Sequence, residues 1–318
     1  MEFGYRIPTA GPLATPEAIQ ALARRGEELG YGVLAIADHV IQPNQIASRY
    51  PYSATGAFSA SAGDWLEQLT LMSYVAALTR KARLITSVMV VPHRPAVLAA
   101  KAIASLDVLS GGRVILGIGT GWMQEEFEAL QLPPFAERGK VTDEYLAAYK
   151  ALWTQEKPSF QGKYVAFSDL TFAPKPVQKP HPPIWVGGES PAAIRRLIAH
   201  GDGWYPIGAN PQFPLNTPQR LAQGFARMQN LARQQGRDPA SIQLGFWANW
   251  YVENQRSTLP TGERHIFTGN AQEIADDAKR LRDLGVGTLM FNFVRPTLKE
   301  SIASIETWAR DVRPKIGE

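Results

Sequence analysis

The stretch Arg113-Val114-Ile115-Leu116-Gly117-Ile118-Gly119-Thr120-Gly121-Trp122 is a short apolar run that opens into a glycine-rich turn. A second run of this kind, Pro183-Ile184-Trp185-Val186, opens into Gly187-Gly188-Glu189-Ser190. Short apolar runs bounded by glycine are typical of buried strands, and a helical pattern follows each of these two. Strand, turn and helix in this order are the parts of a parallel sheet, so the two stretches predict an α/β fold.

The same alternation of strand and helix continues along the whole chain. Eight strands, each followed by a helix, are typical of a closed (β/α)8 barrel, whereas an open doubly wound sheet usually has fewer strands. We therefore expect a single TIM-barrel domain over residues 1–318. The expected strands are residues 2–7, 33–36, 83–91, 114–117, 184–186, 203–206, 242–252 and 288–293, and the expected helices are residues 16–29, 65–78, 95–109, 142–153, 191–200, 218–235, 271–284 and 298–312.

Three longer segments are interpreted as insertions at the C-terminal face of the barrel: residues 41–63, 124–139 and 157–182. The last of them is rich in proline, which excludes it from a helix interior or a central strand. The first contains Ser59-Ala60-Ser61-Ala62-Gly63. We expect this small-residue stretch to be a mobile loop over the barrel mouth that acts as a lid.

The composition excludes several classes of protein. Hydrophobic residues make up 45% of the chain and charged residues 19%, which suits a large buried core, and no apolar run is long enough to span a bilayer. The N-terminal segment Met1-Glu2-Phe3-Gly4-Tyr5-Arg6-Ile7 is predicted to be a strand and not a signal peptide, so we expect a cytoplasmic protein. The net charge of +4 arises from Lys and Arg spread along the chain, which disfavours nucleic acid as a partner.

The chain has no cysteine, which removes thiolate nucleophiles and cysteine-bound metal. Redox chemistry would therefore require a bound cofactor. No metal is expected either, because the sequence has no His-Glu-x-x-His helix and no cluster of carboxylates. A serine hydrolase is disfavoured because there is no G-x-S-x-G elbow.

Both glycine turns are candidate cofactor sites. A strand that runs through glycines into a helix presents free backbone N–H groups and the positive end of the helix dipole, which suit phosphate. Glycine lets a ligand approach the backbone and adopts positive φ without strain. The alternative is that these glycines only allow tight turns. The spacing of Gly117, Gly119 and Gly121 differs from the dinucleotide fingerprint, whose third glycine follows the second by three residues in the first βαβ unit.

Other candidates follow strand ends, where barrel enzymes bind their ligands. Asp38 and His39 come after the second strand and could be a proton-handling pair, although Asp38 could instead cap a loop or helix. His93 and Arg94 follow the third strand and either begin the next helix or, in the case of Arg94, meet an anion. An isomerase or aldolase acting on a phosphorylated substrate is a second enzyme class, but the strand-end Lys that it usually needs is absent.

Several motifs, in this order, resemble the bacterial luciferase-like oxidoreductases and monooxygenases. The resemblance covers nearly the whole chain and is strongest to the branch labelled coenzyme F420-dependent, whose FMN-using relatives share the scaffold. The motifs are Ala37-Asp38-His39, Thr86-Ser87-Val88, Gly112 to Trp122, Glu137-Arg138-Gly139 with Asp143-Glu144, Pro180 to Gly188, and Gly201-Asp202-Gly203-Trp204.

The resemblance implies hydride transfer between a bound F420 or FMN and a small organic substrate, in a homodimer. With FMN the enzyme could be a monooxygenase that uses oxygen, and a barrel that binds the cofactor without catalysis is the further alternative. A non-proline cis peptide bond is implied between Ser87 and Val88. Asp38 and His39 are the implied catalytic residues, and the implied cofactor-binding residues are Thr86, Ser87, Val88, Gly119, Thr120, Gly121, Trp122, Gly187, Gly188, Glu189 and Ser190.

The chain departs from the family pattern at one position. In the deazaflavin dehydrogenases that it resembles, an acidic residue follows the Gly-Thr-Gly turn and donates a proton. Trp122 stands there in this chain and cannot do so. His39, Glu125 or Glu126 could supply the proton instead.

Overall fold

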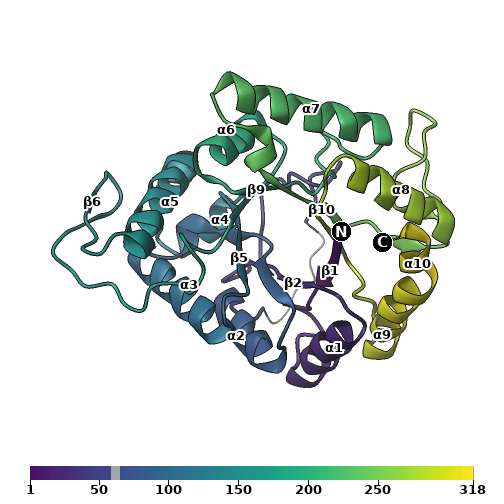
Figure 1. The fold of residues 1–318 in the computed structure, drawn as a ribbon, viewed down its shortest axis with the longest axis horizontal. Helices are drawn as coiled ribbons and strands as arrows, with labels where there is room; N and C mark the ends of the chain where they lie inside the picture. The colour runs from purple at the N-terminus through teal and green to yellow at the C-terminus, as the bar shows by residue number, and fades with distance from the viewer. Residues whose placement is uncertain (59–64, 318) are drawn as a thin grey trace.

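Eight parallel strands form a closed barrel in the computed structural model, which describes residues 1–58 and 65–317 (Figure 1). Each strand pairs with its neighbour in the ring, and the eighth pairs with the first, so the predicted (β/α)8 barrel is confirmed. In ring order the strands are β1 (Glu2–Arg6), β2 (Val33–Ile36), β3 (Arg83–Thr86), β5 (Val114–Gly119), β8 (Ile184–Gly187), β9 (Gly203–Tyr205), β10 (Gln243–Ala248) and β13 (Thr288–Phe291).

Helices surround the barrel, and several of them begin where the sequence supplies a capping side chain (Figure 1). Thr15, Ser190 and Thr217 each accept a hydrogen bond from a backbone N–H of the first turn, which satisfies one of the donors that a helix start leaves free. The main helices are α1 (Pro16–Glu28), α2 (Gln68–Leu78), α3 (Ala96–Ser110), α5 (Arg138–Thr154), α6 (Pro191–His200), α7 (Pro218–Gln234), α8 (Ala271–Asp283) and α9 (Leu298–Thr307).

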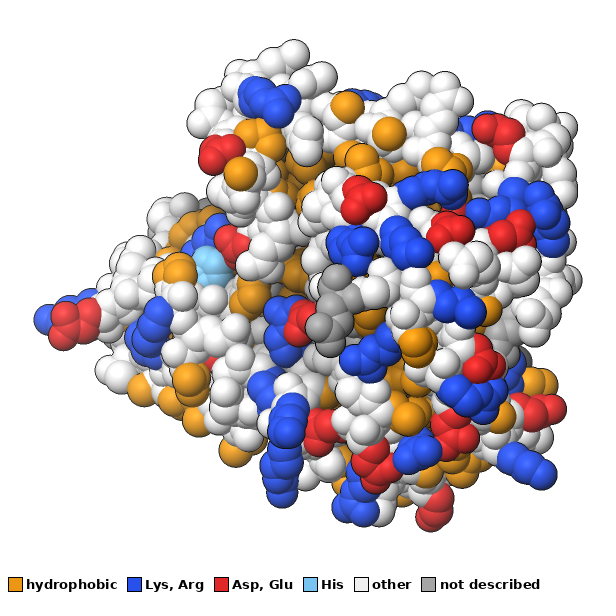
Figure 2. Space-filling model, turned by 45° about the vertical axis from the view of Figure 1, so that its right-hand side comes forward, with side chains coloured by type: hydrophobic (Ala, Val, Ile, Leu, Met, Phe, Trp, Pro, Cys, Tyr) orange, Lys and Arg blue, Asp and Glu red, His pale blue; other side chains and the backbone are white. Residues whose placement is uncertain are grey.

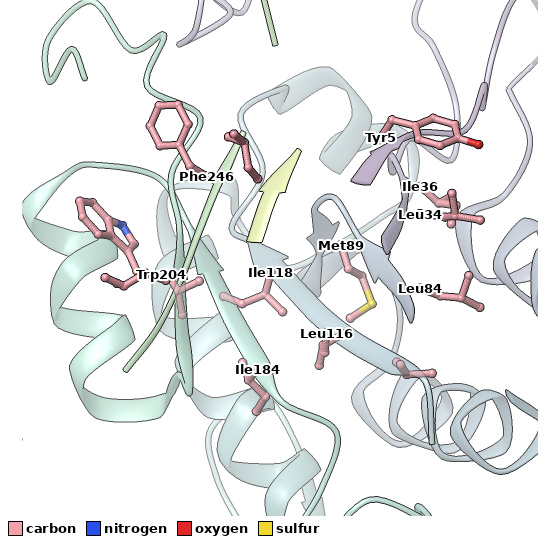
Figure 3. Close-up of a cluster of buried hydrophobic side chains, with 14 of the residues drawn as sticks. Tyr5, Leu34, Ile36, Leu84, Met89, Leu116, Ile118, Ile184, Trp204 and Phe246 are labelled. Atoms are coloured by element: carbon pink, nitrogen blue, oxygen red, sulfur yellow. The ribbon is translucent and has the colours of Figure 1, made fainter. Parts of the chain in front are cut away.

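Alternation along the strands divides the buried side chains into two layers. On β2, Leu34 and Ile36 pack outward against helices, whereas Val33 and Ala35 face the barrel interior. Figure 3 shows part of the outer layer. The inner layer fills the barrel, so only its C-terminal mouth remains for a ligand; it consists of Val33, Ala35, Ile85, Ile115, Trp185, Tyr205, Trp247 and Met290.

Two predicted strands, the third and the seventh, are much shorter than expected. The third ends at Thr86, and after the bond between Ser87 and Val88 the short strand β4 (Met89–Val90) pairs with β5. The seventh ends at Ala248, because β11 (Val252–Glu253) pairs with β12 (Thr268–Gly269) outside the barrel. An unbroken run of β-type residues cannot reveal that the pairing partner changes within it.

Three helix boundaries also differ from the prediction. The helix expected from residue 65 begins at Gln68, because Trp65 bridges to Ala10 and Glu67 caps the helix. The helix expected from residue 142 begins at Arg138. Its first turn is polar and has no apolar periodicity, so the sequence pattern did not indicate this earlier start. Residues 308–312, expected in the last α-helix, form a π-helical turn after α9.

The predicted insertions contain local structure of their own. Residues 124–139 include the short helix α4 (Gln124–Ala129) and reach into the start of α5. Residues 157–182 include the hairpin of β6 (Phe160–Gln161) and β7 (Ala166–Phe167), which extends away from the barrel in Figure 1. The expected lid, residues 59–63, lies outside the described residues.

Charged side chains of both signs share the face of the molecule in Figure 2, where Lys and Arg are interspersed with Asp and Glu. Within residues 1–58 and 65–317, no helix combines the length and the apolar character needed to cross a membrane.

Candidate active site

A cavity of about 980 Å³ opens at the C-terminal ends of the barrel strands. Its wall contains all of the predicted site residues except Thr86, so the structure brings both glycine turns and the Asp38-His39 pair together. Thr86 follows the inward-facing Ile85 and therefore lies on the other side of the strand. Its buried hydroxyl donates to the carbonyl of Gly117 at 2.7 Å and joins β3 to β5.

His39 is hydrogen-bonded to a buried carboxylate. Its Nδ1 lies 2.8 Å from Glu126 Oε2, and Glu126 Oε1 accepts from the amides of Val40 at 2.8 Å and Ile41 at 3.3 Å. Burial alone would raise the pKa of Glu126, but the hydrogen bond and charge of His39, with the other donors, lower it below the ordinary value. Glu126 is therefore ionised at neutral pH and holds the proton of His39 on Nδ1, which leaves Nε2 available to a ligand.

Both carboxylate oxygens of Asp38 accept hydrogen bonds from neighbouring residues. Its two oxygens accept from Arg94 Nη1 at 2.8 Å and Nη2 at 2.9 Å, and Oδ2 also accepts from the amide of Val90 at 2.9 Å. The side chain is buried, and Arg94 is further paired with Glu67. Burial lowers the pKa of Arg94, but Asp38 and Glu67 raise it overall, so the guanidinium stays charged. This geometry favours a positioning role for Asp38 and accounts for Arg94 without a bound anion.

His93 lies on the other side of Glu126. Its Nδ1 is 3.9 Å from Glu126 Oε1, which is beyond hydrogen-bond distance, and its ring packs on Phe127 with the centroids 5.3 Å apart. Burial lowers the pKa of His93, and the neighbouring carboxylates offset this only in part. His93 is therefore neutral near pH 7 and adds no charge to the site.

Val88 accounts for the glycines of both turns. The bond between Ser87 and Val88 is cis, as the family resemblance implies. A Cβ at Gly119 would lie 2.8 Å from Val88 Cγ2, and a Cβ at Gly187 would lie 3.2 Å from Val88 Cγ1. Both glycines thus leave space for Val88, and Gly187 also leaves space for the carbonyl of Ile118, which its Cβ would meet at 3.2 Å. Their role in packing supplements the expected approach of a cofactor to bare backbone.

The second glycine turn leads into a concentration of positive groups, which we call the anion cradle: Gly188, Ser190, Arg138 and Arg196. Gly188 has φ +94°, which favours glycine, and Ser190 caps α6 by accepting from the amide of Ala193 at 3.2 Å. All four residues line the cavity. The amino end of α6 and two guanidinium groups together suit a phosphate.

The two arginines of the anion cradle are held in place by different contacts. Arg196 is paired with Asp143 and donates to the carbonyl of Gly139 at 3.0 Å. Arg138 donates to the carbonyl of Gly121 at 3.2 Å and has no acidic partner within the described residues. Burial and the charge of Arg196 lower the pKa of Arg138. An anion bound between the two guanidinium groups would relieve this repulsion.

Glu189 lies between the anion cradle and the segment after β9. Its Oε1 accepts from the amides of Ile207 at 2.8 Å and Gly208 at 2.9 Å. Burial raises the pKa of its carboxyl group, and these hydrogen bonds oppose that rise only in part. Its role in holding a cofactor stays a prediction.

An aromatic cluster covers one side of the cavity and consists of Tyr50, Tyr52, Phe58, Trp65 and Trp122. The ring of Trp122 lies 5.0 Å from that of Tyr50 and 4.9 Å from that of Phe58, between centroids. The ring of Trp65 lies 4.7 Å from that of His39. Glu125 holds the loop below the cluster, because its Oε1 accepts from the amides of Ala47 at 2.7 Å and Ser48 at 2.9 Å.

Sequence reasoning assigned no role to several of these residues. Arg138 was visible only as part of a motif, and Arg196 lies within a helix without any local signal. The aromatic residues of the first insertion carry no local signal of which rings meet. Glu126 was one of three possible acids, and only the structure pairs it with His39. No group of three His, Asp or Glu side chains suited to a metal ion occurs among the residues that the structure describes.

Comparison with known proteins identifies relatives over the whole chain. An uncharacterized protein of Mycobacterium tuberculosis is 30% identical over 304 residues, which cover 93% of this chain and 94% of that protein. The FMNH(2)-dependent dimethylsulfone monooxygenase of Pseudomonas putida is 38% identical over 146 residues, which cover 45% of this chain and 40% of the relative.

Solved structures agree on the fold. An F420-dependent secondary alcohol dehydrogenase in complex with an F420-acetone adduct superimposes with a TM-score of 0.76, at 16% identity, over 100% of this chain and 99% of the other. The sequence profile of the luciferase-like monooxygenases matches residues 1–310. The chain therefore belongs to the luciferase-like monooxygenase family.

Proposed function

We propose that this chain is a cytoplasmic oxidoreductase that transfers hydride between a bound deazaflavin or flavin and a small organic substrate. The observation that carries the proposal is a single cavity whose wall contains both the anion cradle and the hydrogen-bonded pair of His39 and Glu126. Coenzyme F420 is the cofactor that we put first, and FMN is the second.

The residues present fit the phosphate that both cofactors carry. A Cβ at Gly188 would meet Ala193 Cβ at 3.3 Å, so any larger residue would crowd the amino end of α6. Gly188 and Ser190, with Arg138 and Arg196, would hold the phosphate, and Gly119 to Trp122 would border the body of the cofactor. A bound reduced flavin or deazaflavin supplies the hydride.

The remaining chemistry belongs to residues of the chain. Glu126 fixes the ring of His39 and keeps a proton on Nδ1, so that Nε2 is the atom that exchanges a proton with the substrate. Asp38 holds Arg94 and the amide of Val90, and thereby fixes the end of β2 against β4. The aromatic cluster excludes water from this side of the cavity.

A monooxygenase reaction with reduced FMN is the second candidate. It is supported by the relative of Pseudomonas putida, whose name states that it depends on FMNH2. The F420-dependent alcohol dehydrogenase supports the first candidate only through its fold, because its identity is 16%. Oxygen consumption with reduced FMN would favour the monooxygenase, and substrate reduction under anaerobic conditions with reduced F420 would favour the dehydrogenase.

Cofactor binding gives a direct test of the proposal. Titration with FMN and with F420 should quench the tryptophan fluorescence, because Trp65, Trp122 and Trp247 line the cavity. Arg138→Gln should weaken binding of the cofactor by about tenfold or more, since a charged hydrogen bond is lost. Arg195→Gln, at an exposed position on α6 that does not line this cavity, is the matched control. Failure of both cofactors to bind would contradict the proposal.

We also propose that the enzyme is a homodimer that associates through α2 and α3. These helices contact each other, and five apolar side chains on them remain exposed, among them Leu98 at 63% and Leu109 at 78%. Leu98 and Leu109 are three helical turns apart and share one face of α3. The other three are Tyr74, Val97 and Val108.

Light scattering after gel filtration tests the assembly. Leu109→Glu should convert a dimer into a monomer without loss of the fold, because the change introduces charge into an exposed apolar surface. Gln219→Glu, on the exposed start of α7, is the control and should stay dimeric. A monomeric wild-type chain would refute this part of the proposal.

A further inference from the structure

Arg6 is a partly buried cation that lines the cavity and has no ion-pair partner among the described residues. It ends β1, where Phe3 and Tyr5 pack outward into the core, so the alternation turns Arg6 toward the barrel mouth. Its Nε is buried without a hydrogen-bond partner, and among the described residues its guanidinium forms no ion pair. Burial lowers the pKa of Arg6, and the only opposing influence is Tyr50. A buried guanidinium Nε without an acceptor is costly, which points to a ligand.

Two carboxamides accompany Arg6 on the neighbouring strands. Asn292 comes two residues after the inward-facing Met290 of β13, and Asn249 comes two residues after the inward-facing Trp247 of β10. Both line the cavity together with Arg6. The Oδ1 of Asn292 accepts from the amide of Val294 at 3.2 Å, which leaves the Nδ2 hydrogens as donors. This part of the cavity therefore offers hydrogen-bond donors from the ends of three adjacent strands, β10, β13 and β1.

The anion cradle lies on the opposite side of the barrel. In the ring order β1-β2-β3-β5-β8-β9-β10-β13, β8 is four strands from β1 in either direction. Gly188, Ser190 and Arg196 of the cradle follow β8, whereas Arg6 ends β1, yet both groups line one cavity. The phosphate of a cofactor held at the cradle thus leaves Arg6 unpaired, so a second negative group is needed.

We propose that Arg6, with Asn249 and Asn292, binds an oxyanion of the substrate, a carboxylate or a sulfonate. Arginine presents a fork of N–H donors that matches two oxygens of such a group, and carboxamide N–H groups supply further donors. A neutral substrate would leave the guanidinium without a partner and would bind less tightly. The proposal rests on the proposed function only for the placement of the cofactor at the cradle.

Binding of simple anions to the purified chain tests the proposal. The probes are benzoate and benzenesulfonate, with benzamide as the neutral isostere, and calorimetry is done in a buffer free of phosphate and sulfate so that no other oxyanion competes for Arg6. Wild type should bind one of the two anions about tenfold or more tightly than benzamide. The better anion distinguishes a planar carboxylate from a tetrahedral sulfonate.

Two variants separate this site from the cradle. Arg6→Gln should lose the preference for the anion and keep its affinity for FMN or F420, while Arg138→Gln should do the reverse. Arg6→Lys, which retains the charge but not the fork, should recover part of the anion affinity and guards against a folding defect in Arg6→Gln. Equal binding of benzoate, benzenesulfonate and benzamide, or unchanged anion binding in Arg6→Gln, would overturn the proposal. Anion binding at Arg6 without cofactor binding would uphold it and refute the proposed function.

Discussion

Glu126 and Glu189 follow the two glycine turns, and both are buried, but their surroundings have opposite effects on their acidity. Glu126 receives hydrogen bonds from His39 and from two backbone amides, and its pKa is lowered. The Oε1 of Glu189 accepts hydrogen bonds from the backbone amides of Ile207 and Gly208, and burial raises the pKa of the Glu189 carboxyl group. Burial opposes charge in both cases, and only Glu126 has a histidine that lowers its pKa by hydrogen bond and charge.

The difference separates the cavity into two chemical regions. The wall after β5 holds an ionised carboxylate that is paired with a histidine, which suits proton transfer. The wall after β8 holds a carboxyl group that is more easily neutral, beside the anion cradle. A neutral Glu189 avoids repelling a phosphate, whereas a second ionised carboxylate there would oppose its binding.

Glu126→Gln should have the largest effect of these variants, on both kcat and stability. The change removes the charge that fixes His39, so kcat should fall by about 10²-fold or more, as expected when proton transfer is impaired. The free energy of unfolding should fall by about 1–3 kcal/mol, because an amide cannot satisfy the same donors. Steady-state kinetics and thermal denaturation measure the two effects.

Glu128→Gln is the matched control for that experiment, since Glu128 is exposed on the same helix, α4. It should leave both kcat and stability near the wild-type values. A Glu126→Gln enzyme with full kcat would show that His39 does not depend on this carboxylate.

Alanine at the two glycine turns should have smaller and unequal effects. Gly119→Ala should lower the free energy of unfolding by about 1–3 kcal/mol, because its Cβ would lie 2.8 Å from Val88. Gly187→Ala should cost less, since its contact with Val88 would be 3.2 Å. Chemical denaturation of both variants measures the order.

The double variant Gly119→Ala with Val88→Ala identifies the cause. The truncated side chain at position 88 should remove the collision, so the two changes should be less destabilising together than their sum. Additive losses would mean that Gly119 is needed for another reason.

The pH dependence of stability should distinguish Glu189 from Glu126, and this is the smallest of the expected effects. The folded-state pKa of Glu189 is raised, so its contribution is present below its unfolded pKa of about 4.3 and is lost as the pH rises through the folded value. Glu189→Gln should therefore gain stability relative to wild type as the pH rises above about 4.3. Urea denaturation at a series of pH values measures this.

Glu126 should give the opposite trend in the same assay. Its folded-state pKa is lowered, so its contribution is present above about 4.3 and is lost as the pH falls through the folded value. Glu126→Gln should thus approach wild-type stability in acid. The same direction of change in both variants would contradict the assignment of the two regions.

The sequence allowed the fold and the strand-end residues to be predicted because both have local signals. Apolar runs, glycines and caps indicated eight strand–helix units, whereas the cis bond between Ser87 and Val88 was implied only by the family resemblance. The pairing of His39 with Glu126 joins residues 87 positions apart and leaves no local pattern. Arg6 was hidden for a related reason, since within a strand it reads as an ordinary polar residue until the neighbouring strands surround it.

Val88 fills space that belongs to two other strands, and this has a consequence for how the family can vary. The side chain at position 88 shares one volume with positions 119 and 187. A relative with a larger residue at 119 or 187 should therefore carry a smaller one at 88. The three positions should change together during evolution, even though they lie in three different strand–turn segments of the chain.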